Sequence, residues 1–179
     1  MSDATATLTP AVATLGVGDP SPIRRVRRKR QLPPFLDGVV SEDLYVRWLL
    51  RKAQAHVNRD RKRGMLATGA QYRDAIHAAV MASGGLDDYT GEPLDWRLIS
   101  TYANTESQEG RHHYKAGFAL LPTVDHVEAS ASSASFKICA WRTNDAKNDL
   151  SVEAFIALCA RVLIYAGYRV EPPEQERAT

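Results

Sequence analysis

An aspartate and a histidine stand side by side in the stretch 121–127, whose sequence is LPTVDHV. The carboxylate of Asp125 offers a hard oxygen ligand for a divalent cation, and the imidazole of His126, with an unperturbed pKa of about 6.5, can accept a proton at neutral pH. Further along the chain Asn144 offers a neutral amide oxygen as a second ligand. Phosphodiester hydrolysis needs these groups, because a cation neutralises the charge that develops on the phosphate and a base takes a proton from the attacking water.

The elements that must position these residues are two strands and the start of a helix. Stretches rich in β-forming residues predict strands over 118–127 and 136–142, and a loop of small residues over 129–134 joins them as a hairpin. A polar turn or short helix begins at Thr143, with Asn144 near its start. We therefore expect strand, loop, strand and helix start to bring Asp125, His126 and Asn144 within reach of one another.

This stretch resembles the HNH nuclease superfamily, whose ββα-metal motif reads as Asp-His, a loop, Asn, and then Asn-x-x-Lys. The resemblance covers residues 88–161. It implies that Asp125 is the first metal ligand, that His126 is the general base, and that Asn144 is the second metal ligand. Lys147 matches the lysine of the motif and is expected to be structural or to face a phosphate. The implied cofactor is one divalent cation, Mg²⁺ or Mn²⁺.

The sequence departs from the superfamily at two places. Many members hold a structural zinc with two Cys-x-x-Cys pairs, whereas here the first pair falls on residues 88–91 (DYTG) and the second on Ala140 and Thr143. A variant without structural zinc is therefore implied. Members usually carry a further Asn that orients the general base, nine residues before the ligating Asn, whereas this chain has Ser135. We expect Ser135 or a backbone carbonyl to support the imidazole.

Two helices are predicted before the motif. Ser41, Glu42 and Asp43 are typical of a helix start, and the helix is expected to end near Gly64. A second helix is predicted over 69–83, and the two should form a helical hairpin. The first helix is strongly basic, and phosphate contacts are expected from Arg47, Arg51, Arg59, Arg61, Lys62 and Arg63. The alternative for these six residues is a solvated helix face.

Length and charge set the domain organisation. The chain has 179 residues, enough for one folded domain with tails. The first 63 residues carry 13 Lys and Arg against six acids, a net charge of +7, whereas the whole chain carries +2. We predict an α+β fold with a disordered basic tail over 1–40, the helical hairpin over 41–85 and the HNH-like core over 86–169. The core would end in a C-terminal helix that begins at Ser151, and 170–179 would be a disordered tail.

Several other polar or aromatic groups are given structural interpretations. The acids between residues 87 and 95 are predicted to lie in a solvated turn, and the two cysteines, Cys139 and Cys159, are expected to be small core residues. Core packing is favoured over base stacking for Trp48, Trp96 and Trp141. His56 and His77 are predicted to be ordinary helix residues, and His112 and His113 to lie in a solvated loop.

The function predicted from these observations is that of a metal-dependent HNH endonuclease, a hydrolase that cuts nucleic acid and most readily DNA. With no apolar run of about 20 residues and no signal peptide, a cytoplasmic protein without membrane attachment is expected. The main alternative is a catalytically inactive module on the same fold that binds nucleic acid or a protein partner. A helical interaction protein with an incidental Asp-His pair is a third interpretation. A homodimer and a companion protein are both left open.

Overall fold

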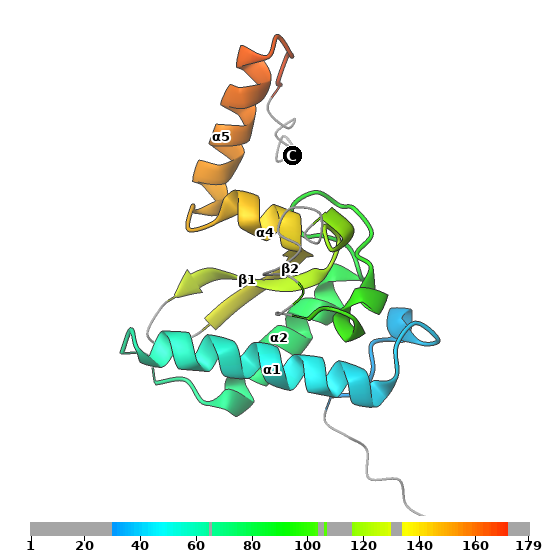
Figure 1. Ribbon diagram of the computed structural model, residues 1–179. Coiled ribbons are helices and arrows are strands. Elements are labelled where there is room, and N and C mark those ends of the chain that lie inside the picture. The colour runs from blue at the N-terminus through cyan, green and yellow to red at the C-terminus, as the bar shows by residue number, and fades with distance from the viewer. Residues whose placement is uncertain (1–29, 65, 104–105, 107–115, 130–133, 172–179) are drawn as a thin grey trace, which may run out of the picture.

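The computed structural model describes residues 30–64, 66–103, 106, 116–129 and 134–171 (Figure 1). Within these ranges a two-stranded antiparallel hairpin is followed by helices, which confirms the predicted α+β class. The elements in chain order are η1 (Pro34–Leu36), α1 (Glu42–Arg61), α2 (Gly69–Ser83), η2 (Trp96–Ser100), β1 (Pro122–Ala129), β2 (Ala134–Ala140), α4 (Trp141–Lys147) and α5 (Val152–Tyr165).

Helices α1 and α2 begin at side chains that cap them. The hydroxyl of Ser41 accepts a hydrogen bond from the backbone N–H of Leu44, and Glu42 and Asp43 follow in the first turn of α1. At the start of α2, Thr68 and Gln71 form a reciprocal capping box, and α2 ends at Gly84 in the left-handed conformation. Both predicted helices are therefore confirmed, and they pack against each other and, through α2, against β2.

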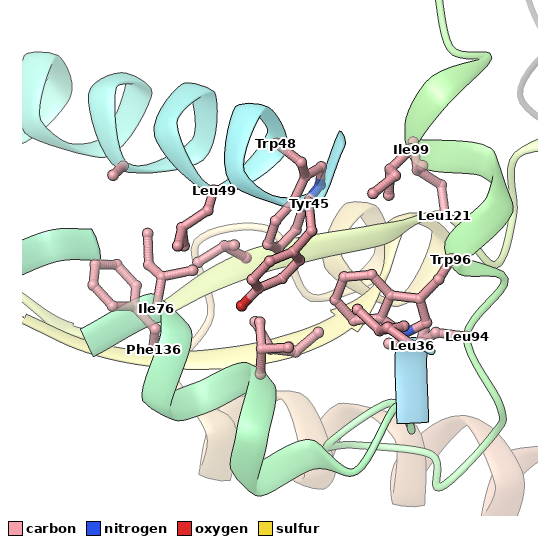
Figure 2. Close-up of a cluster of buried hydrophobic side chains, with 14 of the residues drawn as sticks. Leu36, Tyr45, Trp48, Leu49, Ile76, Leu94, Trp96, Ile99, Leu121 and Phe136 are labelled. Carbon is pink, nitrogen blue, oxygen red and sulfur yellow. The ribbon is translucent and has the colours of Figure 1, made fainter. Parts of the chain in front are cut away.

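The core lies between this helix pair, the hairpin and η2, as Figure 2 shows. Trp48 of α1 meets Trp96 of η2 edge to face, with ring centroids 5.3 Å apart. Ile76 and Val80 of α2 and Ile138 of β2 are completely buried. The structural interpretation of Trp48 and Trp96 is confirmed, since each is only 2–3% exposed.

The folded part of the chain begins earlier than the predicted tail boundary at residue 40. Leu36, at the end of η1, is 1% exposed and belongs to the core cluster. Arg30 forms an ion pair with Asp74 of α2, with Nη2 and Oδ1 2.6 Å apart. The apolar content of residues 32–36 explains the difference, because Leu36 joins the core cluster and Leu32 and Phe35 pack against it. The predicted tail segments 1–29 and 172–179 lie outside the described residues.

The β1–β2 hairpin starts and ends a few residues away from the prediction. Residues 118–121 precede β1 as turns, and Trp141 and Arg142, predicted as strand, form the first turn of α4 instead. The register pairs Asp125 with Lys137 and His126 with Phe136, and it shifts by one residue between His126 and Glu128. Val127 is thus an extra residue in β1, and such a β-bulge bends the strand and redirects the neighbouring side chains.

Helix α4 packs on both strands, whereas α5 leads away from the hairpin (Figure 1). No side chain of α5 is buried. The prediction that both cysteines are core residues is right for Cys139 and wrong for Cys159, which is exposed because no described part of the chain covers its side of α5. Among the described residues, no helix is both long enough and apolar enough to cross a membrane.

Candidate functional site

A pocket of about 540 Å³ lies where the C-terminal end of α1 meets β1 and α4. All four residues of the predicted motif border this pocket, namely Asp125, His126, Asn144 and Lys147. Two arginines of the basic helix, Arg59 and Arg63, border it as well, and residues 148–151 complete its wall. Residues from three elements that are far apart in the sequence are therefore gathered around one hollow.

Asp125 and His126 reach this pocket from opposite faces of the hairpin. Consecutive side chains of a strand point to opposite sides. Asp125 therefore faces α4, where it contacts Lys147, and His126 faces α1 and α2, where it lies among His56, Asp60 and Phe136. The bulge at Val127, which also lines the pocket, lies directly beside His126.

The carboxylate of Asp125 is buried and held by two partners. Its Oδ2 accepts a hydrogen bond from the hydroxyl of Tyr89 and lies 3.1 Å from Nζ of Lys147, whose side chain is 4% exposed. Tyr89 is itself fixed by the Lys137 ammonium, 4.8 Å above its ring, and by an edge contact with Phe155 of α5. Burial, and then the hydrogen bond to Asp125, raises the pKa of Tyr89, so this residue acts as a hydrogen-bond donor.

The imidazole of His126 lies in an aromatic environment. It stacks on Phe136, its cross-strand partner, at 5.1 Å between ring centroids, and the ring of His56 lies 5.9 Å away. Burial lowers the pKa of His126, and Arg59 and Arg63 act in the same direction, against the carboxylate of Asp60. The ring is therefore neutral at neutral pH and can accept a proton. Within the described part of the chain, its Nε2 atom is buried without a hydrogen-bond partner.

Asp60 is the acidic residue closest to this imidazole, and it was not among the predicted site residues. Its Oδ2 lies 3.6 Å from Nδ1 of His126 and accepts a hydrogen bond from the hydroxyl of Tyr72 at 2.6 Å. Asp60 is 1% exposed although it belongs to a basic helix. Its position could have revealed it, because a charged residue that follows Tyr45, Leu49, Ala53 and His56 on one helical stripe is buried and needs a partner.

The prediction that the acids around residue 87 lie in a solvated turn is wrong for Asp87, whose side chain is buried and only 1% exposed. Its Oδ1 accepts from the backbone N–H groups of Tyr89 and Thr90, and its Oδ2 accepts from the N–H of Ala140 and the hydroxyl of Thr143. The next residue acts in the same way, since Oδ2 of Asp88 accepts a hydrogen bond from the backbone N–H of Ile138. These carboxylates tie the turn to the junction of β2 and α4, because that junction offers N–H groups with no strand neighbour.

The groups that could hold a cation are few. Asp125 and Asn144 border the pocket, and Asn144 is the fourth residue of α4 rather than its first. No cluster of three or more His, Cys, Asp or Glu side chains suited to a metal ion occurs among the residues that the structure describes. A cation here would therefore take Asp125, Asn144 and water or phosphate oxygens as ligands, a set that suits Mg²⁺ or Mn²⁺.

The remaining predicted site residues are spread along the chain. Ser135 is exposed and lies beyond Phe136 on β2, away from the pocket lining. Arg47 and Arg51 line a separate groove of about 520 Å³ against Ile99, and Arg51 donates a hydrogen bond to the carbonyl of Ile99. Arg61 and Lys62 are exposed at the end of α1. His112 and His113 lie outside the described residues.

Comparisons with models of protein families, with curated proteins and with solved structures find no match to this chain.

Proposed function

We propose that this protein is a metal-dependent endonuclease of the HNH type that hydrolyses phosphodiester bonds, with DNA as the preferred substrate. The observation that carries the proposal is the common pocket of Asp125, His126, Asn144, Arg59 and Arg63. A carboxylate and an amide for a cation, a neutral imidazole and two guanidinium groups for phosphate are what the reaction requires. The basic charge of the first 63 residues also suits a polyanionic substrate.

Asp125 and Asn144 are the residues that would hold the cation. One carboxylate oxygen of Asp125, Oδ2, contacts both Tyr89 and Lys147. When bound, the cation would supply positive charge to the phosphate and to the departing oxygen. Lys147 would limit the negative charge at Asp125, and the Tyr89 hydroxyl would fix the direction of the carboxylate.

His126 would accept the proton of the attacking water. The carboxylate of Asp60 lies near Nδ1 and favours a proton on that atom, which leaves the lone pair on Nε2. Nε2 is buried in the structure without substrate, so binding of the substrate would have to turn or uncover the ring for the transfer. Asp60 would thus be a positioning residue that takes over the orienting role expected of Ser135. Arg59 and Arg63 would bind the phosphate backbone, because guanidinium groups match the geometry of phosphate oxygens.

The alternative function is a catalytically inactive module that binds nucleic acid. The observation that favours it is the buried ion pair between Lys147 and Asp125, since the ammonium already neutralises the carboxylate that a cation would need. The two proposals differ in what divalent ions do. The nuclease gains thermal stability from Mg²⁺ or Mn²⁺ through Asp125, whereas the inactive module does not.

The decisive experiment is nicking of supercoiled plasmid by the full chain with Mg²⁺ or Mn²⁺, with EDTA as a blank. His126→Ala should lower the nicking rate by about 10²–10⁴-fold, the usual contribution of a general base, and should keep the rise in Tm with Mn²⁺. Asp125→Asn should lose both the nicking and the rise in Tm.

His77→Asn is the matched control, because His77 is also a partly buried histidine with a lowered pKa but pairs with Tyr45 away from the pocket. It should nick at the rate of the unmodified chain. Plasmid that stays supercoiled with every metal, together with a Tm that no metal moves, would discard the nuclease in favour of the binding module.

A further inference from the structure

Helix α5 presents apolar side chains to solvent on all sides. Nine large apolar residues between Leu150 and Val170 are exposed, among them Ile156 (60%), Val162 (60%), Ile164 (58%) and Tyr165 (97%). Only two charged residues occur in α5 itself, Glu153 and Arg161. Figure 1 shows the helix leading away from the hairpin beyond α4. A 14-residue helix of this composition needs an apolar partner, because isolated helices of this length are marginal in water.

The composition of α5 argues against a lipid surface as that partner. Helices that lie on membranes carry a polar face rich in Lys and Arg beside their apolar face. In α5, Arg161 is the single basic residue, and it lies on the same face as Glu153, Ala157 and Ile164 at four- and three-residue spacings. The face opposite to this stripe carries Phe155, whose ring contacts Tyr89 of the same chain. The stripe therefore points away from the body.

We propose that α5 of one copy packs antiparallel against α5 of a second copy, around a two-fold axis at Ala157. In such a pair residue 153 lies opposite residue 161, so Glu153 of each copy faces Arg161 of the other. The acid and the base are equally far from Ala157, and this symmetry makes the stripe complementary to itself. The small side chains of Ala157 and Ala160 let the two helices approach closely at the axis.

The same register also places the end of each helix. It brings the end of α5, with Ile164 and Tyr165, beside residues 149 and 150 of the second copy. Asp149 and Leu150 are part of the pocket wall, so the tip of each α5 lies at the rim of the other copy's pocket.

The proposal does not depend on the proposed nuclease activity, and it is tested by sedimentation equilibrium of the full chain over a wide range of concentrations. The unmodified protein should be a dimer. Ile164→Glu should weaken the dimer by at least about tenfold in Kd, since it replaces an apolar side chain of the helix contact with a charge in each copy. Leu66→Glu is the matched control, because Leu66 is 90% exposed and lies between α1 and α2, far from α5 in the chain.

The charge pair tests the register independently of folding. Glu153→Arg alone and Arg161→Glu alone should each weaken the dimer several-fold, because each brings like charges together at two symmetric places. The double variant Glu153→Arg/Arg161→Glu restores opposite charges and should recover the dimer. A protein that stays monomeric at all concentrations overturns the proposal, and so does a dimer that Ile164→Glu leaves intact. Failure of the double variant to recover overturns the antiparallel register.

Discussion

The face of the β1–β2 hairpin that looks toward α1 and α2 holds His126 among aromatic rings, whereas the face toward α4 holds Asp125 among hydrogen-bonding groups. On the first face Phe136, His56 and Tyr72 surround one carboxylate, Asp60. On the second, Asp87 and Asp125 accept hydrogen bonds and an ion pair from the turn, from β2 and from α4. The comparison teaches that two adjacent residues depend on different parts of the chain. His126, the proposed base, depends on the N-terminal helices, and Asp125, the proposed metal ligand, depends on the turn at 87–90 and on α4.

The largest effect on this comparison is expected from Asp87→Ala on the α4 face. The variant leaves three backbone N–H groups and the Thr143 hydroxyl without their acceptor in a buried place, at a cost of about 3 kcal/mol or more in the free energy of unfolding. Chemical denaturation measures this loss. Asp95→Ala is the control, because Asp95 accepts one N–H at the start of η2 and should cost about 1 kcal/mol or less. If the two variants lose equal unfolding free energy, the four hydrogen bonds to Asp87 stabilise the fold no more than the single cap at Asp95.

The opposite face should respond to acid. Burial, assisted by Arg59, His126 and Lys52 and opposed by Asp60, lowers the pKa of His56 to about 3. The unfolded chain, with an ordinary His pKa of about 6.5, binds the proton first as the pH falls. Stability conferred by neutral His56 is therefore present above about pH 6.5 and is lost toward pH 3, by at most about 1.4 kcal/mol per pH unit.

Denaturation curves at pH 7 and pH 5 measure this effect. His56→Leu should have a smaller loss between the two values than the unmodified chain, with a residual slope from His126, whose pKa is also lowered. If His56→Leu loses as much unfolding free energy between pH 7 and pH 5 as the unmodified chain, then another group causes the loss.

Asp60→Asn tests whether the N-terminal helices support the chemistry. The variant keeps the size of the side chain and removes the charge beside Nδ1 of His126, so kcat for plasmid nicking should fall by about tenfold with little change in KM. Tyr72→Phe is the control, since it removes the other partner of the same carboxylate and leaves the charge in place. If both variants lower kcat alike, Asp60 acts through packing alone.

The smallest effect is expected along the basic helix. Arg63, just beyond the end of α1, borders the pocket, whereas Arg47 lies about 21 Å from that end of the helix at 1.5 Å per residue. Arg63→Gln should raise KM a few-fold and lower the salt slope of DNA binding by about one, while Arg47→Gln should do less. A larger effect from Arg47→Gln would locate the substrate on the groove beside Ile99.

Much of this organisation could be predicted from the sequence because it is local. Caps at Ser41 and Thr68, the glycine after α2 and the β-forming stretches are signals within a few residues, and the spacing of Asp125, His126 and Asn144 was enough to predict that they would meet. The partners of these residues could not be predicted in the same way. Asp60 and His126 are 66 positions apart, and only the packing of α1 against β1 brings them together.

The four hydrogen bonds to Asp87 have a practical consequence for handling the protein. They join the turn at residues 87–90 to the start of α4 with atoms that the chain itself supplies. Chelators and oxidants therefore leave this junction intact. If the proposed nuclease activity holds, EDTA should act as a reversible switch for it, so that metal can be withdrawn and returned in one sample without a refolding step.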